Sequence, residues 1–142
     1  MQSWSWLIFG LLSALFAALV AIFGKLGLGK IDTTLATTAR AAVMFVFLLL
    51  TTGFMGKLSG LGSIDAKGWF YIILAGVAGA LSWLCYFWAL RIGRASQVAP
   101  IDRLSVVFVI ILAALFLGEK IGWKSGVGAT LVTVGAILIA LA

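Results

Sequence analysis

The sequence has no histidine, a single cysteine, a single proline and only four acidic residues among 142. The absence of histidine removes the commonest metal ligand and the usual pH switch near neutrality. The four acids are scattered and form no zinc, calcium or nucleophile and base pattern, so we expect neither a metal nor a cofactor, and no enzyme. Cys85 has no partner in the chain, which excludes an intramolecular disulfide.

Charge is also scarce, since charged residues make up 10% of the chain and hydrophobic residues 64%. A soluble domain carries roughly 25% charged residues to cover its surface. The net charge of +6 comes from basic residues that lie singly or in pairs at loop positions, so nucleic acid is not an expected partner. They are typical of residues flanking a membrane, and we expect the lipid bilayer to surround an integral membrane protein.

Five apolar segments are long enough to cross a bilayer, because a helix rising 1.5 Å per residue needs about 20 residues for a core of roughly 30 Å. The predicted spans, all within one domain covering 1–142, are residues 4–24, 33–54, 68–90, 95–117 and 124–141. Tryptophans favour the headgroup boundary and fall at predicted ends, at Trp4, Trp6, Trp69 and Trp123. Asp32 and Asp65 stand where an N-cap stabilises the next helix. The fold class is therefore all-α, with five spans.

The loops give little bias in orientation. The first and third loops carry Lys25, Lys30, Arg91 and Arg94; the opposite side carries Lys57, Lys67, Lys120 and Lys124, so four minus four leaves no excess. A chain with an odd number of spans that inserts both ways can pair with an antiparallel copy, which reproduces an inverted-repeat transporter. The alternative is one orientation set by weaker cues. Gly122 and Gly126 form a small-xxx-small pair, either a dimer interface or internal packing.

Three ionisable residues lie inside predicted spans, where each costs roughly 2.5–3.5 kcal/mol near the centre and is a functional candidate. Arg40 and Asp102 lie at similar depth in helices that begin on the same side, so we predict that they pair and line a polar cavity. Arg103 is the third. Thr37 precedes Arg40 by about one helical turn, so its hydroxyl either contacts solute or bonds to its own backbone.

Pro100 has no amide hydrogen, so in a helix interior it leaves the carbonyl of Ser96 without its partner and kinks the helix. The alternative is that the helix begins at Pro100, which places Asp102 in a first turn where the dipole favours an acid. Glu119 closes the same predicted span beside Lys120. An ion pair at the membrane interface explains Glu119 as well as a functional role does.

Aromatic residues cluster in the third span, at Trp83, Tyr86, Phe87 and Trp88. Trp83 and Phe87 are four residues apart and share a helix face. These rings either line a solute pocket or contact lipid and neighbouring helices.

Over essentially its whole length the sequence resembles the drug/metabolite transporter superfamily, in particular its EamA-like, five-helix bacterial and archaeal branch, and the stretch from the third to the fourth span is the most specific part. The matching segments are YFWAL at 86–90, Gly93, ASQVAPIDRLSVV at 95–107 and LGE at 117–119. The resemblance implies a multi-pass protein of the cytoplasmic membrane that transports or exports a small metabolite. Larger members hold two such units in inverted arrangement, so a homodimer working by alternating access is expected here.

The related small multidrug resistance proteins bind cations through an acid in the first helix. This chain has none there, so that mechanism is not expected. Within the spans, two arginines outnumber one aspartate, which favours an anionic or zwitterionic solute. A small channel and a noncatalytic membrane subunit of a larger assembly are the alternatives.

Overall fold

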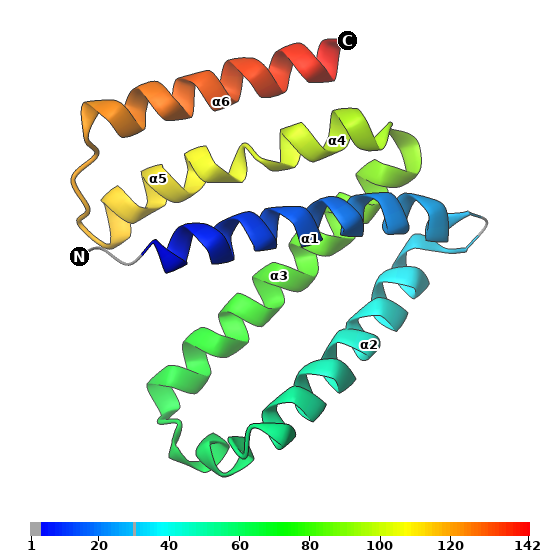
Figure 1. Ribbon diagram of the computed structural model, residues 1–142, viewed down its shortest axis with the longest axis vertical. Coiled ribbons are helices and arrows are strands. Elements are labelled where there is room, and N and C mark those ends of the chain that lie inside the picture. Colours follow the sequence, from blue (N-terminus) through cyan, green and yellow to red (C-terminus); the bar gives the residue numbers. More distant parts are fainter. Residues whose placement is uncertain (1–3, 30) are drawn as a thin grey trace. The chain divides into compact units, whose positions relative to one another are not determined.

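The computed structural model describes residues 4–29 and 31–142, and the regular secondary structure in these residues is helical throughout (Figure 1). Its elements are α1 (Ser5–Leu28), α2 (Thr33–Phe54), the short 3₁₀ helix η1 (Leu58–Ser63), α3 (Ala66–Ile92), α4 (Ala95–Asp102), α5 (Ser105–Phe116) and α6 (Trp123–Leu141). With α4 and α5 taken together as one span, five helical segments are long and apolar enough to cross a membrane. The predicted number of spans is confirmed.

The chain divides into two compact units. One consists of Met1–Leu26 and Ala89–Ala142, in which α6 packs against α4 and α5. The other consists of Gly27–Trp88. There, α2 and α3 run in opposite directions and are joined through η1, as Figure 1 shows.

The helix starts follow the sequence closely. The Asp32 side chain accepts a hydrogen bond from the Leu35 amide at 3.0 Å, and Asp65 Oδ1 accepts one from the Gly68 amide at 3.0 Å. Each satisfies an amide that has no partner within its helix, so both predicted N-caps are present. The bounds of α2 are those predicted, whereas α1 continues four residues beyond the predicted end at residue 24.

Lys25 lies in this extra turn of α1 and interacts with the end of α3. Its ammonium group donates hydrogen bonds to the carbonyl oxygens of Leu90 and Gly93, the latter at 2.8 Å. The last carbonyls of a helix have no intrahelical partner and carry the negative end of the helix dipole, so a cation is stabilising there. Lys25 therefore joins the ends of two spans within one unit.

We expect Lys25→Met to lower thermal stability, because the substitution keeps an apolar stem of similar length and removes both hydrogen bonds. Hydrogen bonds to a charged group contribute about 1.5–3 kcal/mol, so a loss of that order is expected. The measurement is thermal unfolding of the purified protein in detergent, followed by circular dichroism. Lys57→Met is the matched control, since Lys57 is exposed and makes no side-chain cap bond. Equal effects of the two substitutions would contradict a capping role for Lys25.

The fourth span was predicted as one segment, residues 95–117. In the structure it is interrupted at Arg103 and Leu104 and forms two helices, α4 and α5. At the interruption, the Arg103 amide is shared between Ala99 O at 3.3 Å and Pro100 O at 3.1 Å, and the Leu104 amide donates to Ile101 O at 3.0 Å. These short-range bonds tighten the chain into turns where the regular ladder fails. Pro100 lies inside α4, so the expectation of an interior proline is confirmed and the alternative of a helix beginning at Pro100 is wrong.

This arrangement also settles the positions of two acids. Asp102 is the last residue of α4, so the alternative that placed it in a first turn is wrong. Glu119 does not close the helix, because α5 ends at Phe116 and Glu119 follows in the loop. Gly118, with φ +67°, adopts the left-handed conformation that commonly ends helices, and the Glu119 amide returns to the carbonyl of Ala113 at 3.3 Å.

Candidate functional site

Arg40, in α2, lies over an aromatic surface formed by α3. Its guanidinium carbon is 3.4 Å from the centroid of the Trp83 ring and 5.3 Å from that of Phe87. The two rings are stacked, with centroids 5.7 Å apart and an angle of 26° between their planes. The prediction that Trp83 and Phe87 share a face is therefore confirmed. A cation over an aromatic face is stabilised by about 0.5–2 kcal/mol, more when water is excluded.

Tyr86 completes this cluster. It meets Trp83 edge to face with centroids 6.1 Å apart, and Phe87 likewise at 5.9 Å. Trp88, the other predicted aromatic site residue, is 52% exposed and makes none of these ring contacts. Arg40, Trp83, Phe87 and Tyr86 thus form one continuous group, which we call the Arg40 cluster.

The Arg40 cluster borders a cavity of about 560 Å³ between α2 and α3. It is lined by Thr34, Thr37, Thr38, Arg40, Ala41, Met44, Phe45, Leu48, Ala75, Gly76, Gly79, Ala80, Trp83 and Leu84. The volume is within the usual range of small-molecule sites, about 300–1,000 Å³. The lining is apolar apart from one cation and three threonines.

Two of the three lining threonines, Thr37 and Thr38, have hydroxyls bonded within their own helix. Thr37 donates to Thr33 O at 2.8 Å and Thr38 to Thr34 O at 2.9 Å. Of the two roles expected for the Thr37 hydroxyl, the structure therefore shows the bond to its own helix backbone. Each hydroxyl oxygen retains lone pairs and remains able to accept a hydrogen bond. The guanidinium of Arg40 has no hydrogen-bond partner among the described residues of its unit. Because stacking uses only its face, its N–H edge remains available for an anion.

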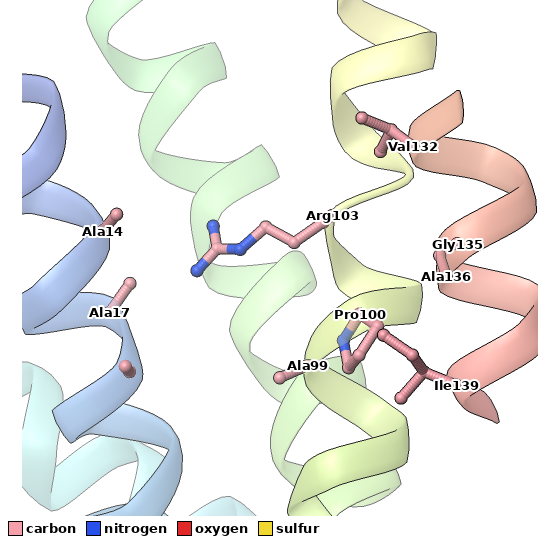
Figure 2. A pocket seen from close by; sticks show the side chains of 10 residues that line it. Ala14, Ala17, Ala99, Pro100, Arg103, Val132, Gly135, Ala136 and Ile139 are labelled. Carbon is pink, nitrogen blue, oxygen red and sulfur yellow. The ribbon is translucent and has the colours of Figure 1, made fainter. Parts of the chain in front are cut away.

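A second cavity, of about 490 Å³, lies in the other unit between α1, α4 and α6. It is lined by Ala14, Ala17, Ala18, Ala99, Pro100, Arg103, Val132, Gly135, Ala136 and Ile139, and we call it the Arg103 cavity. Figure 2 shows the Arg103 side chain leaving the junction of α4 and α5 and extending towards Ala14 and Ala17 of α1. Arg103 and Pro100 were predicted from the sequence, but the α1 wall was not, although the helical spacing of Ala14, Ala17 and Ala18 indicates one small-residue face.

The remaining predicted site residues are placed as follows. Asp102 and Arg40 belong to different units, so their pairing stays a prediction. Ser96, whose carbonyl Pro100 leaves without its usual partner, lies in the first turn of α4. Gly122 is the N-cap of α6, and Gly126 follows one turn later. Among the described residues, a Cβ built on either glycine meets no atom within 4 Å outside its chain neighbours and its own helix backbone, and the role of the pair stays a prediction.

Comparison with known proteins shows which family the chain matches. Residues 4–141 match the EamA-like transporter family, which is nearly the whole chain. The chain belongs to the EamA-like transporter family. No solved structure matches it.

Relatives of this EamA-like protein support the same assignment. The chain is 40% identical over 140 residues to the "uncharacterized transporter in cobO 3'region" of Sinorhizobium, covering 99% of both chains. It is 26% identical over 137 residues to an uncharacterized protein of Methanocaldococcus jannaschii, covering 95% and 96%. It is also 36% identical over 59 residues to the pseudopaline exporter of Pseudomonas aeruginosa, which is 42% of this chain and 21% of that protein.

Family and fold together establish the general activity. The protein is a multi-pass membrane protein of a transporter family, with five helices capable of contacting the bilayer. The family and the names of its relatives indicate a transporter rather than an enzyme.

Proposed function

We propose that this EamA-like protein is a secondary transporter of a small anionic or zwitterionic metabolite in the cytoplasmic membrane. One observation carries the proposal: each unit holds an arginine near the middle of a span, beside a cavity. Arg40 and Arg103 are the eighth and ninth residues of spans of 22 residues. They therefore lie about 10 and 12 Å from the span starts, at 1.5 Å per residue. The midplane of the hydrocarbon is at about 15 Å.

Arginine at this depth favours a negatively charged group on the solute. A guanidinium does not lose its charge in proteins and offers five N–H donors in a planar fork, which fits a carboxylate or phosphate with two parallel hydrogen bonds. Holding such a charge in a span is costly, and an anionic solute reduces that cost. The stacking on Trp83 fixes the plane of the Arg40 guanidinium before the solute arrives, so less side-chain freedom is lost on binding.

We also propose that the transporter works as an antiparallel homodimer with alternating access. A single five-helix unit is half of an inverted-repeat transporter, and the level distribution of basic residues allows either orientation. Open space at Gly122 and Gly126 supports a place for a neighbouring helix to approach closely. In such a dimer both copies contribute their arginines to the transport path.

Counterflow in proteoliposomes tests the proposal without knowledge of the solute. Vesicles containing the purified protein are loaded with an unlabelled bacterial metabolite extract and placed in the same extract labelled with ¹³C. Mass spectrometry of the vesicle contents then identifies any labelled solute that has entered. We expect at least one anionic or zwitterionic metabolite to enter saturably, and faster when the lumen holds the same unlabelled compound.

Three results would contradict this proposal, each in a different way. Entry that does not saturate and is not accelerated from the opposite side indicates a channel. No entry above that of protein-free vesicles indicates a membrane subunit that needs a larger assembly. Selective entry of cations contradicts the assigned charge of the solute.

A further inference from the structure

We infer that the Arg103 cavity binds an organic anion that carries an apolar tail. The inference rests on the proposed function and deepens it by naming the chemical class of the solute. It follows from the charge at one end of the cavity and from the chemistry of the walls.

Arg103 is the only charged residue among the ten that line this cavity. Within the described part of its unit, its guanidinium has no hydrogen-bond or ion-pair partner. Its side chain is exposed, so a group from outside the chain can reach it. An arginine without a counter-charge at this depth in a span is unfavourable, and a carboxylate, sulfonate or phosphate supplies the missing partner.

The other nine lining residues offer no side-chain donor or acceptor, since all are alanine, glycine, proline, valine or isoleucine. The α1 side consists of alanine methyl groups alone, which leaves room close to the helix. A polar solute would lose its hydration against these walls without new hydrogen bonds, whereas an alkyl tail loses nothing. Each methylene that becomes buried tightens binding by about fourfold.

The cavity of about 560 Å³ beside the Arg40 cluster differs both in its arginine and in its walls. Its arginine is already stacked on Trp83, and threonine oxygens line the same space. We therefore expect the Arg103 cavity to be the site where affinity depends on the length of the solute's apolar tail. A small change in the volume of its walls alters the space for that tail.

Binding is tested on the full-length protein in phosphatidylcholine nanodiscs by isothermal titration calorimetry, with empty nanodiscs subtracted. The probe is hexanesulfonate, which stays ionised at neutral pH and combines an anionic head with a six-carbon tail. Ethanesulfonate tests the tail, and hexyltrimethylammonium tests the sign of the charge. The variants are Arg103→Gln, which removes the charge, and Ala17→Leu, which fills the cavity from α1. Arg94→Gln is the control, an exposed arginine of the same unit outside the cavity.

We expect saturable binding of hexanesulfonate, at least thirtyfold weaker binding of ethanesulfonate, and none of hexyltrimethylammonium. Arg103→Gln is expected to weaken hexanesulfonate binding at least tenfold, and Arg94→Gln to leave it unchanged. Ala17→Leu keeps the charge and shortens the space for the tail, so it should weaken hexanesulfonate more than ethanesulfonate. This second variant keeps the test decisive if Arg103→Gln does not fold.

Equal binding of the anion and the cation would overturn the inference, and so would equal losses in the Arg103 and Arg94 variants. Unchanged binding to Ala17→Leu would also overturn it. Because the assay measures binding alone, its result is separate from the counterflow experiment. Hexanesulfonate binding without any counterflow leaves the site standing and removes the transport proposal. Counterflow without hexanesulfonate binding does the reverse.

Discussion

Arg40→Gln is expected to reduce counterflow of the ¹³C-labelled solute by at least tenfold. The variant keeps a side chain capable of hydrogen bonding but loses the charge and the fork of donors. Removing one partner of a buried charge pair costs about 2–5 kcal/mol, which corresponds to a roughly 30-fold or larger effect. Initial rates in proteoliposomes, corrected for the amount of reconstituted protein, give the comparison.

Two further variants separate the charge of Arg40 from its stacking. Arg40→Lys keeps the charge and loses the planar fork, so an intermediate rate is expected. Trp83→Leu removes the aromatic surface under the guanidinium, with an expected loss of several-fold from a contribution of about 0.5–2 kcal/mol. Arg94→Lys, at the N-cap of α4, serves as the control, because it leaves the charge of the loops unchanged. Full activity of Arg40→Gln would remove Arg40 from the solute site.

Orientation is the second property for which a large effect is expected. Substituting Lys57→Gln and Lys67→Gln leaves four minus two, or two, basic residues on that side against four on the other. Such a protein should insert in one orientation and lose activity in cells, because an antiparallel partner is missing. Lys30→Gln with Arg94→Gln gives the opposite bias by the same arithmetic.

Co-expression of the two oppositely biased variants should restore activity that neither has alone. Orientation itself is measured with Ser59→Cys in a Cys85→Ala background, using a maleimide that does not cross membranes. We expect about half of the molecules with unaltered charges to be labelled from outside, as dual insertion requires. Labelling of all molecules from one side, or full activity of a single biased variant, would contradict the antiparallel dimer.

Much of the fold is predictable because each span carries its own signals. Apolar length determines the number of spans, and the caps at Asp32 and Asp65 depend only on neighbouring residues. Trp69 and Trp123 lie in the first turns of α3 and α6, as expected at a membrane boundary. The shared face of Trp83 and Phe87 follows from helical spacing alone. All of these are local properties.

The features that were missed depend on contacts between distant parts of the chain. The Gly-Lys-Leu-Gly sequence after residue 23 is typical of a loop, yet it remains helical where Lys25 bonds to the end of α3. Pro100 indicated a kink, but the interruption falls at Arg103 and Leu104, where bonds to the carbonyl three residues earlier enter the ladder. The sequence predicted Asp102 as the partner of Arg40. The structure also shows an aromatic partner, Trp83, which was not predicted.

Threonine hydroxyls add a constraint on what this EamA-like protein can carry. Six of them among the described residues, at Thr37, Thr38, Thr51, Thr52, Thr130 and Thr133, donate to the carbonyl four residues earlier. Their protons are therefore already committed, and each hydroxyl oxygen can only accept further hydrogen bonds. A sugar needs hydrogen-bond donors and acceptors all around its ring and would find few donors along these helices. A compact acid with one apolar side needs few such donors and suits the proposed transporter better.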